Sequence, residues 1–269
     1  MNLHYQKIGN GKKILLSFHG MGQDFLCFQK FAQTFESQYT TYLFDLPYHG
    51  KSGGIDGNNY VENEVISKEI WKEYLHNFLE ENQIKNFSII AFSMGGRFAL
   101  ATVEAFTERI EELILLAPDG ITEDPKYILA TRYGFTRKIF KSVIQNNEKY
   151  HAFANLLART GIVHKKVVKF AKMMVDTPQK QEQLYRAWVG FHQLSFNVKN
   201  LAELINNQGI TTKIFMGKYD KLLPMNRVFP LTKRLKNVEL IELEATHGKL
   251  IEKTIEFLKV GANSIRPAD

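Results

Sequence analysis

The chain has 269 residues, of which 44% are hydrophobic and 23% charged, and its net charge is +7. These proportions are typical of a globular protein and exclude disorder throughout the chain. A single cysteine, Cys27, excludes an internal disulfide and any metal site built from several cysteines. No apolar run reaches the roughly 18 residues of a membrane-spanning helix, and the N-terminus lacks the apolar stretch of a signal peptide. We therefore expect a cytoplasmic protein.

The first 120 residues alternate strand-like and helix-like segments. Nearly continuous apolar runs, typical of strands buried on both faces, occupy residues 14–18, 41–46, 87–92 and 112–117. Helical character is found between them, over residues 23–38, 62–83 and 94–106. This alternation predicts an α/β fold whose central sheet is mostly parallel and is flanked by helices.

The strand pattern stops between about residues 121 and 206. This segment is helical and rich in aromatic residues and methionine, and within it residues 121–200 carry a net charge of +9, which leaves −2 for the rest of the chain. Strand patterns return at 212–216 and 238–243, before a closing helix at 248–260. We therefore predict a core domain of residues 1–120 and 207–269, with a helical cap, residues 121–206, inserted before the last two strands.

The segment AFSMGG, residues 91–96, follows a predicted strand and opens a predicted helix. Its pattern is that of a nucleophile elbow, G-x-S-x-G, with Ala91 in place of the first glycine. Such a turn holds its serine in a strained conformation and needs small neighbours, here Gly95 and Gly96. The pattern predicts that Ser93 is a nucleophile; the alternative is a turn in which the serine hydroxyl caps the helix.

A serine nucleophile needs a base and a group that orients the base. Asp220 and His247 each follow a predicted strand, in the chain order serine, acid, histidine that this kind of site requires. Both would lie at the carboxyl edge of the sheet, where open α/β sheets bind ligands. We predict Ser93, Asp220 and His247 as a catalytic triad, with Asp119 as an alternative acid.

Acyl transfer also needs two donors for the oxyanion of the tetrahedral intermediate. One donor would be the backbone N–H of Met94, which follows the nucleophile. The other would come from the loop after the first apolar run, FHGMGQ at residues 18–23, where we predict the N–H of Met21. His19 precedes the serine in chain order, so we expect its ring to organise the loop.

Taken together, these motifs resemble those of the α/β-hydrolase superfamily in its cap-bearing branch. The resemblance spans nearly the whole chain and rests on five segments: HGMG at 19–22, DLPYHGKS at 45–52, AFSMGG at 91–96, GKYDKLLP at 217–224 and THG at 246–248. The sequence departs from the family pattern at Tyr48, where a glycine is usual, and at Ala91. In this family Asp45 is expected to brace its loop.

The resemblance implies a serine hydrolase that cleaves a carboxylic ester or thioester through an acyl-enzyme, without a metal or an organic cofactor. It leaves alternatives, because the same fold carries several chemistries. A carbon–carbon hydrolase uses the same triad. A lyase similar to the menaquinone-pathway enzyme of this fold is a further alternative, since Arg97 resembles a basic residue that holds an anionic substrate there. A binding protein on a hydrolase scaffold is the non-enzymatic alternative.

The predicted cap would supply most of the substrate pocket. Its aromatic residues, among them Tyr133 and Trp188, would line a pocket for an acyl group; the alternative is that they pack the cap helices together. The basic cap would attract an anionic or lipid-like substrate, or it would contact an acidic membrane surface. The alternative is that its charged residues form a solvated helical face. No nucleic-acid-binding motif is present, so we expect no nucleic-acid partner.

Overall fold

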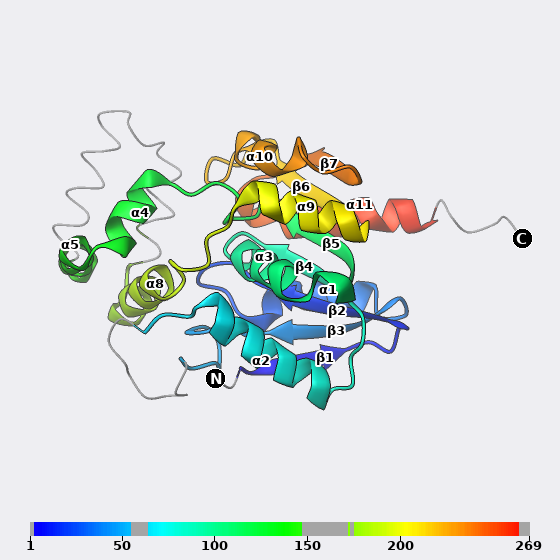
Figure 1. Cartoon of the computed structure of the whole chain (residues 1–269), viewed down its shortest axis with the longest axis horizontal. Helices are drawn as coiled ribbons and strands as arrows, with labels where there is room; N and C mark the ends of the chain where they lie inside the picture. The colour runs from blue at the N-terminus through cyan, green and yellow to red at the C-terminus, as the bar shows by residue number, and fades with distance from the viewer. Residues whose placement is uncertain (1–2, 55–63, 147–171, 173–174, 264–269) are drawn as a thin grey trace, which may run out of the picture.

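The computed structural model describes residues 3–54, 64–146, 172 and 175–263 of the chain (Figure 1). Its centre is one seven-stranded sheet in the order β1-β3-β2-β4-β5-β6-β7. The strands are β1 (Tyr5–Ile8), β2 (Lys13–Phe18), β3 (Tyr39–Phe44), β4 (Phe87–Phe92), β5 (Ile110–Leu116), β6 (Thr211–Gly217) and β7 (Val238–Leu243). All neighbours are parallel except β1 and β3, so the predicted mostly parallel sheet is confirmed.

Helices cover both faces of the sheet. α2 (Lys68–Glu81), α3 (Gly95–Phe106) and α9 (Val198–Gln208) lie on the face toward the viewer in Figure 1, and α3 contacts both α2 and α9. On the opposite face α1 (Gln29–Thr34) contacts α11 (Leu250–Asn263). Every residue of β3 and β4 is buried, as the continuous apolar runs predict for strands covered on both sides.

Short helical turns complete the described part of the core. They are η1 (Phe25–Phe28), η2 (Thr107–Arg109), η3 (Met225–Arg227), α10 (Phe229–Thr232) and η4 (His247–Lys249). Local signals explain where the longer helices begin. Ser67 caps α2 by accepting a hydrogen bond from the N–H of Ile70 (3.3 Å). Trp71, one turn in, is fully buried and donates to Thr102 of α3 (2.9 Å), which fixes α2 against α3.

Two core segments differ from the predictions. Residues 23–38 form η1, α1 and a turn instead of one helix. The carbonyl of Glu36 accepts hydrogen bonds from the N–H groups of Asn10 and Gly11, and the carbonyl of Gln38 accepts one from Lys13. Helix α1 ends because this partner loop binds those carbonyls. Strand β1 was not predicted, because its four residues are exposed or half-buried and show no apolar pattern.

The predicted insert contains three described helices, which we call the cap helices: α4 (Pro125–Arg132), α5 (Gly134–Gln145) and α8 (Pro178–Gly190). They lie beyond the carboxyl ends of the parallel strands, at the left of Figure 1. A small apolar cluster joins α5 and α8, and is formed by Ile144, Val175, Leu184, Tyr185 and Val189. The chain enters the cap helices after β5 and returns to the sheet through α9 and β6.

Helix boundaries within the insert follow the sequence signals. Thr177 caps α8 by accepting from the N–H of Lys180, and Pro178 takes the first helical position. A helix break near Gly134 separates α4 from α5, whereas the break expected near Gly161 lies outside the described residues. Helix α9 falls largely inside the predicted insert, yet its buried residues belong to the main core cluster. Among the described helices, none is long and apolar enough to cross a membrane.

Candidate active site

Ser93 lies in the turn between β4 and α3, and its backbone has a φ of +52°, in the left-handed region. Such a conformation is costly for a residue other than glycine and needs support from its surroundings. The carbonyl of Ser93 accepts hydrogen bonds from the N–H groups of Gly96 and Asp119, both at 2.9 Å, and its own N–H donates to Leu116 (3.0 Å). A Cβ on Gly95 would stand 2.1 Å from the carbonyl oxygen of Phe18, so this turn requires glycine there.

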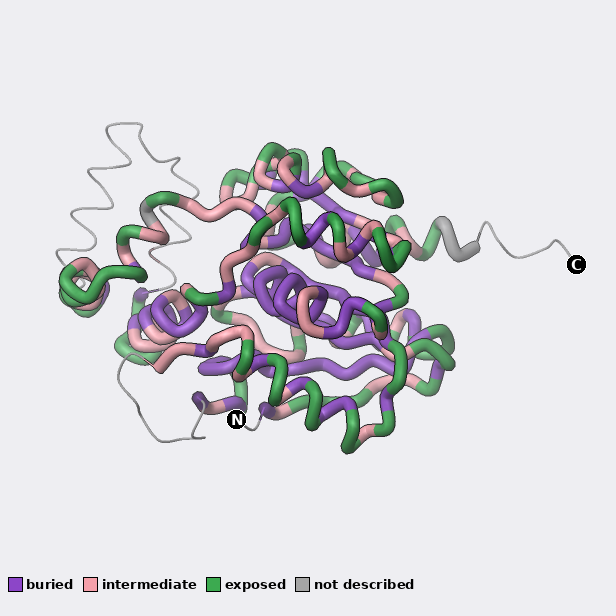
Figure 2. The backbone as a smooth tube through the Cα atoms, in the orientation of Figure 1, coloured by how far each residue is buried: buried purple, intermediate pink, exposed green. Residues whose placement is uncertain are grey.

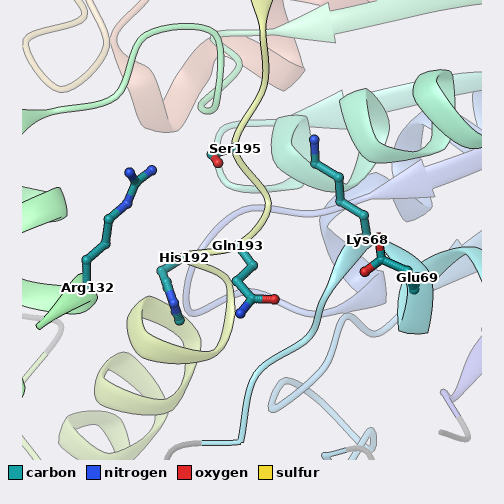
Figure 3. A pocket seen from close by; sticks show the side chains of 6 residues that line it. All are labelled: Lys68, Glu69, Arg132, His192, Gln193 and Ser195. Carbon is teal, nitrogen blue, oxygen red and sulfur yellow. The ribbon is translucent and has the colours of Figure 1, made fainter. Parts of the chain in front are cut away.

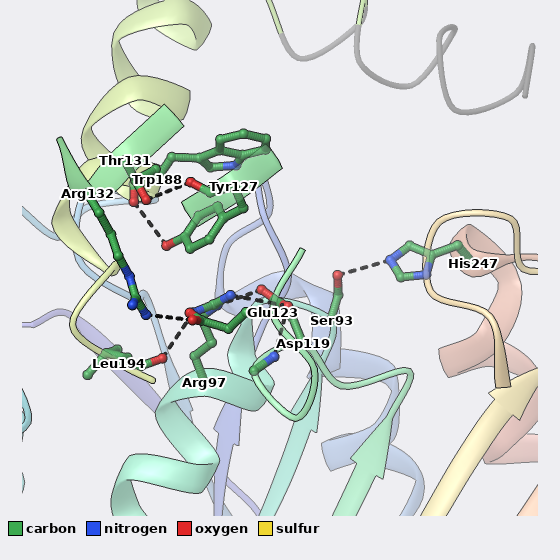
Figure 4. Close-up of polar contacts among 11 residues, drawn as sticks. Ser93, Arg97, Asp119, Glu123, Tyr127, Thr131, Arg132, Trp188, Leu194 and His247 are labelled. Carbon is green, nitrogen blue, oxygen red and sulfur yellow. Dashed lines mark hydrogen bonds and ion pairs between the residues drawn. The ribbon is translucent and has the colours of Figure 1, made fainter. Parts of the chain in front are cut away.

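The structure brings Ser93 together with the two other residues of the predicted triad. His247 Nε2 lies 3.0 Å from Ser93 Oγ (Figure 4). On the other side of the ring, His247 Nδ1 lies 2.6 Å from Asp220 Oδ2. Asp220 follows β6 and its carboxylate is fully buried; its other oxygen accepts from the N–H groups of Leu222 (2.8 Å) and Leu223 (3.0 Å). A chain of hydrogen bonds thus runs from the hydroxyl through the imidazole to a fixed carboxylate.

Asp119, the alternative acid, lies on the other side of the serine. Its carboxylate is paired with Arg97 at 2.6 Å. Its backbone N–H supports the Ser93 carbonyl, and Gly120 donates its N–H to the Asp119 carboxylate at 2.8 Å. The acid that contacts His247 in the structure is Asp220.

The two predicted oxyanion donors lie in the expected loops. Met94 directly follows Ser93 and is buried, while Met21 is half-buried in the loop after β2. Within the described residues, neither backbone N–H donates a hydrogen bond to another backbone or side-chain group. Two N–H groups without an acceptor among the described residues, one directly after Ser93 and one in the loop after β2, are suited to receive a developing negative charge.

His19 organises the loop that carries Met21. Its Nε2 accepts a hydrogen bond from the N–H of Leu46 (2.9 Å), so the proton is on Nδ1, which donates to the carbonyl of Gly20 (2.8 Å). Burial lowers the pKa of His19 from its ordinary 6.5 to about 4. A neutral imidazole therefore holds this loop against the segment that follows β3.

Asp45 braces that neighbouring segment, as the sequence suggests. Its carboxylate accepts from the N–H groups of Phe25 (2.8 Å) and Lys51 (2.9 Å) and lies 2.8 Å from His4 Nδ1. Tyr48, where the family usually has glycine, keeps the conformation that favours glycine, with a φ of +66°. Its side chain turns toward the cap.

The geometry gives Arg97, which was predicted to bind substrate, a set of internal contacts. Arg97 is only 2% exposed, and its guanidinium contacts Asp119 (2.6 Å), Glu123 (3.3 Å) and the carbonyl of Leu194 (3.0 Å) (Figure 4). Its charge also lies 4.5 Å from the centre of the Tyr127 ring. These partners come from the chain entering and leaving the cap, so Arg97 ties both connections to the first turn of α3.

The two aromatic residues predicted to bind substrate pack or project elsewhere. Trp188 stacks on Phe140 with 5.2 Å between ring centres and meets Tyr127 edge-on at 5.4 Å, which joins the three cap helices. Tyr133 is 59% exposed between α4 and α5. The contacts of Trp188 are those of the helix-packing alternative, and Tyr133 is largely exposed among the described residues.

Sequence reasoning missed the side chains that attach the cap. The Tyr48 ring stacks on Phe191 at 5.7 Å, its hydroxyl donates to Glu64 (2.7 Å), and its carbonyl accepts from Gln183 of α8 (2.9 Å). Met21 packs against both the core cluster and the cap cluster. The substitution of tyrosine for the usual glycine at position 48 was the one available signal.

A separate polar cavity of about 320 Å³ opens where the cap meets α2 (Figure 3). Its lining residues are Lys68, Glu69, Arg132, His192, Gln193 and Ser195. Two of its cations are paired with acids, Lys68 with Glu104 and Arg132 with Glu123, each at 2.6 Å. Among the residues that the structure describes, no cluster of three or more His, Cys, Asp or Glu side chains is arranged to hold a metal ion.

Comparison with known proteins places this fold and site in a class. Over residues 13–253 the sequence matches the family described as alpha/beta hydrolase fold. The structure is similar to that of a thermophilic esterase from Thermogutta terrifontis, with a TM-score of 0.68 and 16% identity over 98% of this chain and 94% of the other. The chain therefore belongs to the α/β-hydrolase fold family.

Curated relatives carry related names. A hydrolase of Bacillus subtilis, YugF, is 23% identical over 266 residues, which are 96% of this chain and 92% of the relative. A Mycoplasma genitalium protein that carries the name esterase/lipase 2 is 24% identical over 142 residues, 51% of each chain. The match with this Mycoplasma relative thus spans about half of the relative's length.

Proposed function

We propose that the protein is a serine hydrolase that cleaves a carboxylic ester or thioester through an acyl-enzyme formed on Ser93. One observation carries the proposal: a serine with a φ of +52° is linked through His247 to a buried carboxylate, that of Asp220, by contacts of 3.0 and 2.6 Å. This arrangement activates a hydroxyl that is otherwise a weak nucleophile.

In the first step His247 Nε2 takes the proton of the Ser93 hydroxyl while Oγ attacks the substrate carbonyl. The buried Asp220 accepts a hydrogen bond from Nδ1–H, which fixes the tautomer and stabilises the imidazolium as it forms. The N–H groups of Met21 and Met94 donate to the oxyanion. Loss of one such donor typically costs about 3 kcal/mol in the transition state.

The imidazolium then gives its proton to the leaving oxygen or sulfur, and the alcohol or thiol departs. Water attacks the acyl-serine in the second step, with His247 as the base, and releases the carboxylic acid. In each step one proton passes through His247: from Ser93 to the leaving group in the first step, and from water back to Ser93 in the second.

The names of two relatives agree with ester cleavage. The Thermogutta structure is titled an esterase, and the Mycoplasma relative is named for esterase and lipase activity. The lyase alternative depended on Arg97 as a ligand for an anionic substrate, and that guanidinium contacts Asp119, Glu123 and Leu194 instead. No described feature favours carbon–carbon cleavage over ester cleavage.

The proposal is tested by intact-mass labelling with a fluorophosphonate probe, alongside hydrolysis of p-nitrophenyl acetate. We expect one adduct on the wild type, none on Ser93→Ala, and a fall in kcat of about 10⁴-fold in that variant. Ser195→Ala is the matched control, because Ser195 is half-buried and lines the separate polar cavity. It should label and hydrolyse like the wild type.

Other results have distinct meanings. An adduct that persists in Ser93→Ala would assign the nucleophile elsewhere and overturn the proposal. A folded wild type that neither labels nor hydrolyses the small ester would also overturn it, in favour of a binding protein on this scaffold.

A further inference from the structure

The outer part of the cap exposes large apolar side chains at an unusual density. Four of the eleven exposed large apolar residues in the described chain lie within residues 129–139, and they are Leu129 (57%), Tyr133 (59%), Phe135 (76%) and Ile139 (47%). The other seven are scattered over the core. We call these four residues the cap outer face. Clustered exposed apolar side chains mark interaction sites more often than single ones do.

Helix geometry places these side chains away from the cap interior. Phe135 and Ile139 are one turn apart on α5, so they share one side of that helix. The opposite side of α5 packs on α8 through Phe140 and the buried Ile144. In Figure 1 α5 is the described element at the left edge of the molecule, far from the sheet, and Figure 2 shows much of it exposed. The cap outer face therefore projects outward.

The charge of the same segment has one sign. Residues 125–146 contain five Lys or Arg and no Asp or Glu. The acids just before it are engaged, since Glu123 pairs with Arg97 and Arg132, and Asp124 with Arg227.

Along α5 a basic hollow lies beside the apolar residues. An open cavity of about 330 Å³ is lined by Lys138, Lys141, Ser142, Gln145 and Asn146. Its lysines, hydroxyl and amides are donors suited to a phosphate group. One helix thus presents cationic donors on one flank and apolar side chains on the next.

We propose that the cap outer face docks on the surface of an anionic phospholipid bilayer. Lys138, which lines the basic hollow, would contact a lipid phosphate, while Phe135 and Ile139 enter the boundary between headgroups and acyl chains. A second copy of this chain fits less well, because the two faces would bring like charges together. The proposal concerns binding and does not depend on the function proposed for Ser93.

The test is co-sedimentation of the full-length protein with vesicles of phosphatidylcholine alone or with 30% phosphatidylglycerol. We expect binding to the anionic vesicles that is at least tenfold tighter than to neutral ones and that weakens between 50 and 300 mM salt. The double variant Phe135→Ser/Ile139→Ser should weaken binding at least tenfold, and Lys138→Glu at least fivefold. All three side chains are exposed, so these variants should keep the wild-type melting temperature.

Matched controls are Leu26→Ser and Lys30→Glu, an exposed apolar residue and an exposed lysine on the core. They should bind anionic vesicles like the wild type. Absence of binding to anionic vesicles would overturn the proposal, and so would equal binding by the Phe135→Ser/Ile139→Ser variant. A loss of binding in the core controls as large as in the cap variants would overturn it too, because binding would then follow overall charge and not this face.

Discussion

The core and the cap of this protein are built differently. The core has one large apolar cluster around a sheet whose central strands are buried on both faces. The described cap has three helices and a small cluster of five buried residues, and it exposes large apolar side chains. All the residues that we propose for the chemistry, Ser93, Asp220, His247 and the two backbone donors, come from the core. The difference separates the residues that we propose for the chemistry, which a tightly packed core holds in place, from a cap with a smaller core and a more exposed apolar surface.

Three core side chains illustrate how the described part of the cap is joined to the core. Arg97 reaches both connections to the cap, Tyr48 packs on Phe191 and α8, and Met21 touches both clusters. Each of these residues follows a strand of the sheet, in a loop or in the first turn of a helix. The loops that shape the candidate site are therefore also the loops that hold the cap. Substitutions in the core, in the cap and between them test how far the two regions differ in packing and how they are linked.

The largest expected difference in stability is between two glycine-to-alanine substitutions, one in the core and one in the cap. Gly95→Ala would put a Cβ 2.1 Å from a backbone oxygen of β2, so the elbow must shift; we expect a loss of at least about 3 kcal/mol in the free energy of unfolding. Gly134→Ala in the cap meets nothing within 4 Å and should be neutral or stabilise by about 0.5 kcal/mol. Urea unfolding of both variants measures the difference.

An equal response to the two alanines would contradict the contrast between a tightly packed core and a permissive cap. Hydrolytic activity adds a second measurement, since a displaced elbow should lower kcat in Gly95→Ala and leave it unchanged in Gly134→Ala.

A somewhat smaller effect is expected where the two regions meet. Arg97→Met would leave the carboxylates of Asp119 and Glu123 without their buried partner, at a cost of about 3 kcal/mol. Because the N–H of Asp119 supports the Ser93 carbonyl, kcat should fall as well. Thermal melting and ester hydrolysis measure the two effects.

Lys253→Met is the control for this substitution. Lys253 forms an exposed surface pair with Glu256 and should change neither stability nor activity measurably. If Arg97→Met instead raised KM for anionic esters with kcat and stability intact, Arg97 would be a substrate ligand after all.

A further effect concerns the acid sensitivity of folding, which we assign to core loops. Burial lowers the pKa of His19 to about 4 and that of His49 to about 3, from 6.5. The unfolded chain binds protons on these residues below about pH 6.5 while the folded protein does not, so stability is lost as the pH falls from 6.5 toward 4. The slope is at most about 1.4 kcal/mol per pH unit for each histidine.

Urea unfolding between pH 7 and 4.5 tests this, with His19→Asn as the comparison. The His19→Asn variant lacks the hydrogen bond from the N–H of Leu46 to the imidazole at every pH, so it should be less stable than the wild type at pH 7. Its free energy of unfolding should fall less steeply as the pH falls, because the buried histidine is gone. The difference in stability between variant and wild type should therefore narrow toward low pH. A constant difference across this range would mean that His19 does not contribute to the pH slope.

Much of the core could be predicted from sequence because its signals are local. Apolar runs mark strands buried on both faces, and the small residues around Ser93 mark a tight turn. The order Ser93, Asp220, His247, each after a strand, indicated residues that the parallel sheet then brings to one edge. Strand β1 and the early end of α1 were not predictable, because both depend on pairing with distant segments.

The cap was harder to predict for a physical reason. Aromatic residues and arginine are as common in helix packing and ion pairs as in substrate sites. The residue types at Trp188, Tyr133 and Arg97 therefore do not decide between these roles. Which applies is decided by partners from three separate stretches of chain, as with Arg97 and its contacts to Glu123 and Leu194. The composition of the cap segment predicts that it is helical and basic, but it does not predict the orientation of any side chain.

The chain leaves the sheet for the cap after β5 and returns through α9, and Arg97 contacts both connections, at Asp119 and at the carbonyl of Leu194. The two ends of the insertion therefore start from adjacent points on a scaffold that is complete without it. A cap of different length or composition can occupy this position while the strand order stays the same. At this insertion point the cap can vary without displacing the strands that carry the residues we propose for the chemistry.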